Sequence, residues 1–218
     1  MSEQVRGFAR RVLVVMAFAV AMAYLEAACV AYLQRAIGLT PTRLFPVKRA
    51  STLGGFAAIE VGRELATLVM LWAMGWLVGG SWLTRLAWTS VAFGAWDIAY
   101  YGWLHLFIGW PRSLGTWDLL FLIPAPWAGP VWSPIAVSVA LIGFGLAVAN
   151  RGSTHARVHL SARAFAALVA GGCLVLWAFL WNARVVIDEG IPTAFPWPLF
   201  ALGMAVGVVV AARALRQP

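Results

Sequence analysis

Long apolar stretches, separated by short polar segments with glycine and proline, run along the whole chain. A helix needs about 20 mostly apolar residues to cross a hydrocarbon core about 30 Å thick. On that basis the pattern predicts six transmembrane helices, over residues 12–33, 53–78, 83–108, 131–148, 164–181 and 197–212. The alternation typical of outer-membrane β-strands is absent. The predicted fold is therefore all-α, a polytopic bundle in which residues 1–218 form a single transmembrane domain.

Residues 109–130 interrupt this pattern between the third and fourth predicted helices. The segment is rich in proline and tryptophan, and its apolar part, residues 116–123, is too short to span a bilayer. Its prolines leave the backbone few regular hydrogen bonds, which membrane proteins tolerate only where protein or a wet cavity covers the chain. We expect a short re-entrant or interfacial segment that forms a lid at one end of the bundle.

The composition agrees with a membrane protein. Hydrophobic residues make up 62% of the 218 residues and charged residues 11%, against roughly 25% charged in soluble domains, and the mean hydropathy is +0.84. Although the net charge is +8, the arginines are scattered over the loops instead of forming one basic surface, so no nucleic-acid partner is expected.

The basic residues also indicate how the chain is oriented. With six spans both termini share a side, and that side collects Arg6, Arg10, Arg11, Arg85, Arg151, Arg157, Arg163, Arg213 and Arg216. The other side collects the smaller set Arg35, Arg43, Lys48, Arg49, Arg112 and Arg184. The positive-inside rule then predicts a multi-pass protein of the bacterial inner membrane with cytoplasmic termini.

Ionisable side chains lie inside three of the predicted helices. They are Glu26 in the first, Glu60, Arg63 and Glu64 in the second, and Asp97, Tyr101 and His105 in the third. A rise of 1.5 Å per residue places all of them in or near the outer half of the bilayer. Asp97, Tyr101 and His105, spaced i, i+4, i+8, fall within an arc of about 80° on one helix face. The sequence therefore predicts an outward-facing intramembrane pocket beneath the lid.

Buried charges must be paired, coordinated or neutralised by a proton. Arg63 offsets one carboxylate, and the excess acid suggests a divalent transition metal such as Zn, Fe or Mn. We assign Glu26, Glu60, Glu64 and His105 as candidate ligands, and Asp97, Tyr101 and His105 as candidate catalytic residues. Arg63, Trp117, Asp118 and Trp127 are candidate substrate-binding residues. The leading hypothesis is a metal-dependent membrane enzyme that acts on a lipid or a periplasmic substrate.

Two other functions stay open. Intramembrane acids also mark proton- or cation-coupled transporters, although the last two predicted helices have no charged residue along their middles. A polar network can instead hold helices together in a non-catalytic subunit or assembly factor of a membrane complex. Membrane lipid is the expected partner, and association with another membrane protein or with a second copy also stays open.

Two segments carry a resemblance to other proteins. EVGRELATLVML, which begins at Glu60, and WDIAYYGWLHLFIGWPRSLGTWDLLFLIPAPWAGPVWSP, which begins at Trp96, resemble a group of polytopic inner-membrane proteins from bacteria. The similarity covers about a quarter of the chain. It implies a multi-pass inner-membrane protein, and no activity is attached to the group.

Overall fold

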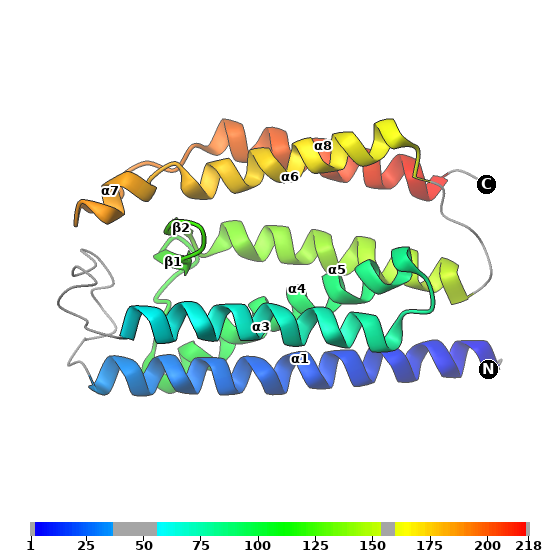
Figure 1. Cartoon of the computed structure of the whole chain (residues 1–218), viewed down its shortest axis with the longest axis horizontal. Helices are drawn as coiled ribbons and strands as arrows, with labels where there is room; N and C mark the ends of the chain where they lie inside the picture. The colour runs from blue at the N-terminus through cyan, green and yellow to red at the C-terminus, as the bar shows by residue number, and fades with distance from the viewer. Residues whose placement is uncertain (1–2, 37–55, 154–159, 217–218) are drawn as a thin grey trace.

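The computed structural model describes residues 3–36, 56–153 and 160–216, and it confirms the all-α bundle. The elements in chain order are α1 (Glu3–Ala36), α3 (Phe56–Val78), α4 (Trp82–Ile108), β1 (Trp117–Phe121), β2 (Trp127–Pro130), α5 (Trp132–Ser153), α6 (Ala162–Leu180), α7 (Ala183–Ile187) and α8 (Trp197–Arg216) (Figure 1). Among the described residues, five helices are long and apolar enough to cross a membrane: α1, α3, α5, α6 and α8. The chain is thus an integral membrane protein.

The helix ends differ from the predicted spans in places. α1 begins at Glu3 instead of residue 12, because its exposed arginines continue the helix beyond the apolar stretch. α5 likewise continues past residue 148 to Ser153. Residues 53–55, the predicted start of the second span, lie outside the described residues. The first turn of α1 and the last turn of α8 lie at the same end of the bundle (Figure 1).

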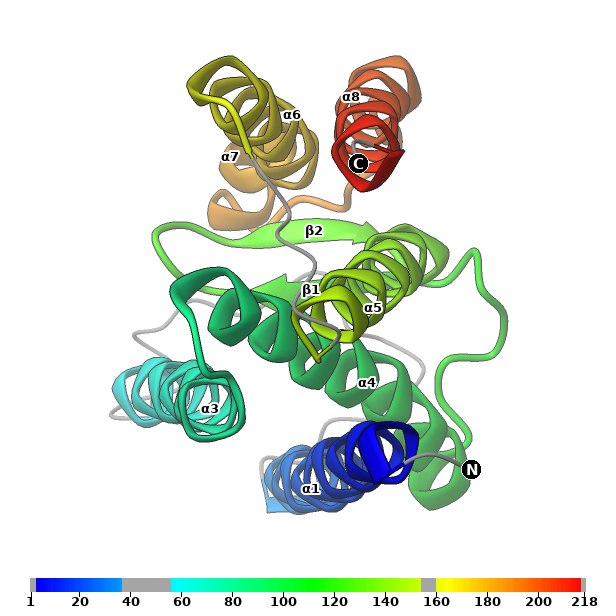
Figure 2. The ribbon, with the colours of Figure 1, turned by 90° about the vertical axis from the view of Figure 1, so that its right-hand side faces the viewer.

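The central helix of the larger layer is α4, which packs against α1, α3 and α5 (Figure 2). Unlike the other long helices, it is not among the five that are apolar enough to cross a membrane, and its 27 residues give a length of about 40 Å. Ser81 caps its first turn by accepting a hydrogen bond from the Thr84 N–H, and Gly109 ends it with a φ of 68°, a conformation that favours glycine. Because three helices surround α4, its polar side chains can contact protein instead of lipid.

α6 and α8 form a second layer, separate from the other helices (Figure 2). The two helices approach closely at Gly171 and Gly203, where a Cβ added to Gly203 would lie 2.7 Å from the Gly171 carbonyl oxygen. Aromatic rings join this layer to the rest of the protein, with Phe179 stacked on Trp127 and in contact with Phe195. The second layer therefore contacts the rest of the protein through the segment that precedes α5 and through the start of α5, where Trp132 stacks on Trp197.

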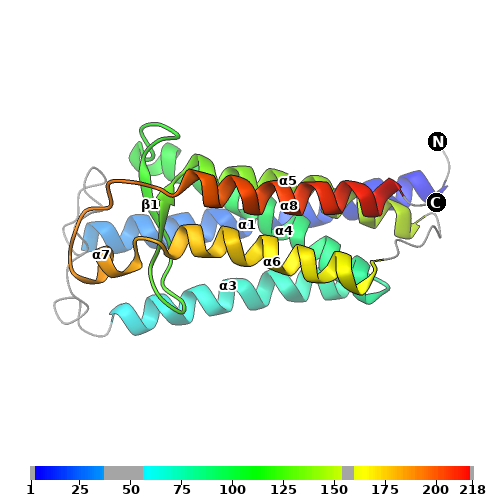
Figure 3. The same cartoon turned by 90° about the horizontal axis from the view of Figure 1, so that it is seen from above.

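That segment is a β-hairpin, which corrects the expectation of an irregular lid. β1 and β2 pair antiparallel, with Trp117 opposite Pro130 and Asp118 opposite Gly129. The pairing shifts register between Leu119 and Phe121. It is possible because the prolines avoid the strand interiors, where a missing N–H would break the ladder: Pro124 and Pro126 lie in the connecting turn and Pro130 ends β2. The hairpin lies between the two helix layers at one end of the bundle (Figures 2 and 3).

The close contact between α6 and α8 can be tested with a matched pair of glycines. Gly203→Ala should lower the thermal midpoint of the purified protein, because the new methyl group would collide with the backbone of Gly171 and Val175; such overpacking costs about 1–3 kcal/mol. The control is Gly207→Ala, since a Cβ there meets nothing within 4 Å. Equal midpoints for the two variants would contradict this packing.

Candidate functional site

A cavity of about 1600 Å³ lies between the two helix layers, with the β-hairpin at one end. Its charged and tyrosine side chains include Glu26, Glu60, Arg63, Glu64, Asp97, Tyr100, Tyr101 and Asp118. The lining from α5, α6 and α8 is almost entirely apolar and includes Leu141, Phe144, Leu168, Leu176, Met204 and Val208. The cavity thus has a polar end and a long apolar part.

Arg63 connects the acids of α1 and α3. One of its guanidinium nitrogens, Nη1, forms an ion pair with Glu26, while its Nη2 and Nε donate to Glu60 Oε2 at 2.7 and 3.0 Å. The Thr67 hydroxyl donates to the second oxygen of Glu26 at 2.8 Å. Two carboxylates therefore share one guanidinium.

Glu64 connects α3 with the tip of the hairpin. Its two carboxylate oxygens both accept from the Leu122 N–H, at 3.1 and 3.0 Å. Glu64 is buried, and this backbone donor comes from a residue directly after β1. The contact positions the hairpin against the helix that carries Arg63.

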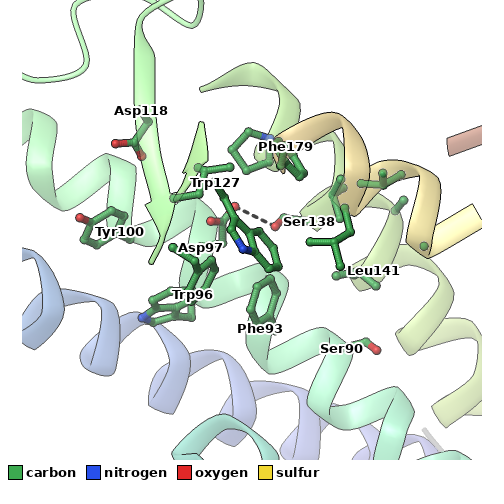
Figure 4. A pocket seen from close by; sticks show the side chains of 18 of the residues that line it. Ser90, Phe93, Trp96, Asp97, Tyr100, Asp118, Trp127, Ser138, Leu141 and Phe179 are labelled. Carbon is green, nitrogen blue, oxygen red and sulfur yellow. Dashed lines mark hydrogen bonds between the residues drawn. The ribbon is translucent and has the colours of Figure 1, made fainter. Parts of the chain in front are cut away.

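Two further carboxylates, Asp97 and Asp118, line the cavity (Figure 4). Asp97 accepts a hydrogen bond of 2.8 Å from the Ser138 hydroxyl of α5. Asp118 accepts from the Tyr101 hydroxyl at 2.8 Å and from the Leu119 N–H at 2.8 Å. Burial raises the pKa of Asp118 to about 6, although both hydrogen bonds lower it. Both aspartates are buried, and among the described residues their hydrogen bonds come from neutral groups.

Most of the candidate residues line this one cavity, but His105 and Trp117 do not. His105 is exposed, and its Nδ1 lies 3.1 Å from the Pro111 carbonyl oxygen. His105 lies in the last turn of α4, where its ring faces the Pro111 carbonyl beyond the helix end instead of the cavity. Trp117 packs edge-on against Phe195 instead of facing the cavity. The structure therefore does not support a role for either residue in the site.

The predicted metal ligands are not assembled. Within residues 3–36, 56–153 and 160–216, no group of three or more His, Cys, Asp or Glu side chains is placed to hold a metal ion. The physical reason is that the Arg63 guanidinium already stands between Glu26 and Glu60, Glu64 is turned to the hairpin backbone, and His105 faces outward. The residues present do not fit the proposed Zn, Fe or Mn site.

Some site residues were missed by the sequence analysis. Thr67 and Ser138 donate to buried carboxylates, yet hydroxyl residues such as Ser90 occur elsewhere in the apolar helices with only local bonds. The spacing of hydroxyl residues in the sequence does not distinguish those that bond to a buried carboxylate from those that bond only within their own helix. Trp96, next to Asp97 in sequence, also lines the cavity, and its position beside an intramembrane acid was an available signal.

The shared guanidinium makes a testable contribution to stability. Arg63→Gln should lower the thermal midpoint, because it leaves Glu26 and Glu60 without their cation, and hydrogen bonds to charged groups contribute about 1.5–3 kcal/mol. Adding Glu60→Gln to that variant should recover part of the loss by removing one unpaired charge. Arg184→Gln, at an exposed arginine of α7, serves as the control. No recovery in the double variant would argue against the pairing.

The buried Asp118 predicts a pH dependence. With its pKa raised from 3.8 to about 6, the folded protein keeps a proton that the unfolded chain has lost, so unfolding free energy falls as pH rises through that window, by about 3 kcal/mol in all. Asp118→Asn imitates the protonated carboxyl and removes the titration. The thermal midpoint of the native protein relative to this variant should therefore fall between about pH 4 and pH 7. A constant difference would contradict the assignment.

Comparison with known proteins does not assign a function to this site. No protein-family model, curated protein or solved structure matches the chain. The membrane class follows from the five long apolar helices, whereas the bacterial inner-membrane location, the orientation of the termini and the sequence resemblance stay predictions. The geometry and lining of the cavity are therefore the basis for a function.

Proposed function

We propose that this membrane protein binds an amphipathic lipid in the cavity between its two helix layers. The observation that supports the proposal is the change of lining along one continuous cavity, from carboxylates, tyrosines and an arginine at the hairpin to aliphatic and aromatic side chains along α5, α6 and α8. The polar part of the lipid lies against the hairpin end. Its acyl part lies along the apolar walls.

The size of the cavity favours a lipid over a small soluble molecule. Sites for small molecules usually have volumes of about 300–1,000 Å³, and this cavity has about 1600 Å³. An apolar wall of this extent gains stability when an apolar ligand replaces water. The acids at the other end keep their hydrogen-bonding partners and can still face a polar group.

A catalytic role on such a lipid is the more specific form of the proposal. Of the three candidate catalytic residues, Asp97 and Tyr101 line the cavity and His105 does not. A carboxylate within hydrogen-bonding distance of the lipid's polar group can act as a general base.

A structural role is the second candidate, and a specific observation favours it. The acids connect different elements: Glu26 bonds to Thr67 of α3, Asp97 to Ser138 of α5, and Asp118 to Tyr101 of α4. Such a network can hold a subunit of a larger membrane complex together. A transporter has less support, because the cavity walls from α6 and α8 offer no charged residue for an ion path.

Cavity-filling variants distinguish lipid binding from a purely structural role. Gly143 and Gly172 line the cavity, and a Cβ at either meets nothing within 4 Å. The double variant Gly143→Leu, Gly172→Leu should therefore fold normally but retain much less lipid, about tenfold less if the lost contacts are worth about 1.4 kcal/mol. The measurement is mass spectrometry of lipid extracted from detergent-purified protein.

The matched control is Gly62→Leu on α3, where a Cβ also meets open space but the residue does not line the cavity. This variant should retain as much lipid as the native protein. Equal retention in all three proteins, or none in any of them, would contradict lipid binding in this cavity.

A further inference from the structure

The volume of the cavity indicates how large its lipid is. The cavity has about 1600 Å³, and a water molecule in the liquid, with one non-hydrogen atom, occupies about 30 Å³. At that density the cavity has room for about 50 non-hydrogen atoms. A phospholipid with two long acyl chains has about 50 such atoms, whereas removal of one chain leaves about 35. A lipid with one chain would therefore leave about a third of the cavity empty.

The length of the apolar part determines how two chains can be arranged. The apolar lining runs from Phe179 to Phe165 on α6 and from Met204 to Leu215 on α8. At a helical rise of about 1.5 Å per residue, these stretches are about 21 and 17 Å long. One leaflet of the bilayer contributes half of a hydrocarbon core about 30 Å thick, so an acyl chain extends over about 15 Å. The apolar part is therefore one chain long, and a second chain has to lie beside the first.

The four helices around the apolar part provide a place for each chain. Figure 2 shows α8 over α5 and α6 over the first half of α4. Phe144 of α5 and Val208 of α8 line the α5/α8 side of the cavity, and Leu86 of α4 and Leu168 of α6 line the α4/α6 side. Packed helices have axes about 8–10 Å apart, and carbon atoms in contact lie about 4 Å apart. The space between the layers is therefore wide enough for two chains side by side.

Building on the proposed lipid binding, we propose that the cavity selects a lipid with two acyl chains on one headgroup. The headgroup lies at the polar end of the cavity. One chain lies on the α5/α8 side, along Gly143, and the other lies on the α4/α6 side, along Gly172. Both glycines line the cavity, and a Cβ at either meets nothing within 4 Å, so each marks space that a chain can occupy.

The test compares two-chain phospholipids with the one-chain lysophospholipids that carry the same headgroup and the same acyl chain. Dioleoylphosphatidylcholine and dioleoylphosphatidylglycerol are each paired with their lyso forms, so that the comparison does not depend on headgroup charge. The delipidated full-length protein in detergent is titrated with each lipid, and bound lipid is counted by native mass spectrometry. In at least one pair the two-chain lipid should bind about tenfold more tightly than its lyso form, because only the former fills both sides of the cavity.

Variants then assign each chain to one side of the cavity. Gly143→Leu and Gly172→Leu, made singly, each fill one side and leave the other open. Each should weaken the two-chain lipid about tenfold and leave the affinity for the lyso form within about twofold of the native value, because a single chain can use the open side. Gly62→Leu, at a glycine of α3 that does not line the cavity, should change neither affinity.

The outcomes separate this inference from the proposed function. Equal affinity of the native protein for the one-chain and two-chain lipids of both pairs would overturn the selection of two chains and leave lipid binding in place. Binding of none of the four lipids would overturn the proposed function itself. Retention of the full preference for two chains in either single leucine variant would show that the chains do not lie on these two sides, and the inference would fail.

Discussion

A polar side chain that is removed from water must find its hydrogen-bonding partners inside the protein, and this requirement organises the larger helix layer. The helix α4 lies among α1, α3 and α5, where Asp97 reaches Ser138 and Tyr101 reaches Asp118. These bonds join α4 to α5 and to the hairpin. The apolar outer surfaces of the bundle are left for lipid.

The second layer is held together by apolar packing instead of polar bonds. The helices α6 and α8 are apolar along their middles and pack on each other at Gly171 and Gly203. They meet the hairpin through stacked aromatic rings such as Trp127 and Phe179. The cavity lies between this layer and the larger one, and its lining from α5, α6 and α8 is almost entirely apolar. The lipid-binding proposal rests on this difference between the layers.

Arg63 changes the chemistry of the polar end. By standing between Glu26 and Glu60 it supplies the cation that those two acids need, so they require no metal to be neutralised. Among the described residues, Asp97 of α4 and Asp118 of β1 accept their hydrogen bonds from neutral groups. Both carboxylates line the cavity at its polar end.

By itself the sequence determined the membrane class, the approximate helices and the gathering of Glu26, Glu60, Asp97 and Tyr101 near one depth, because bilayer thickness and helical rise set length and depth along each axis. It could not determine how neighbouring helices rotate about their axes. Only the tertiary structure decided that Arg63 reaches Glu26, that His105 turns outward, and that residues 117–130 pair as a hairpin. Those outcomes depend on contacts between segments distant in the sequence, which local periodicity does not encode.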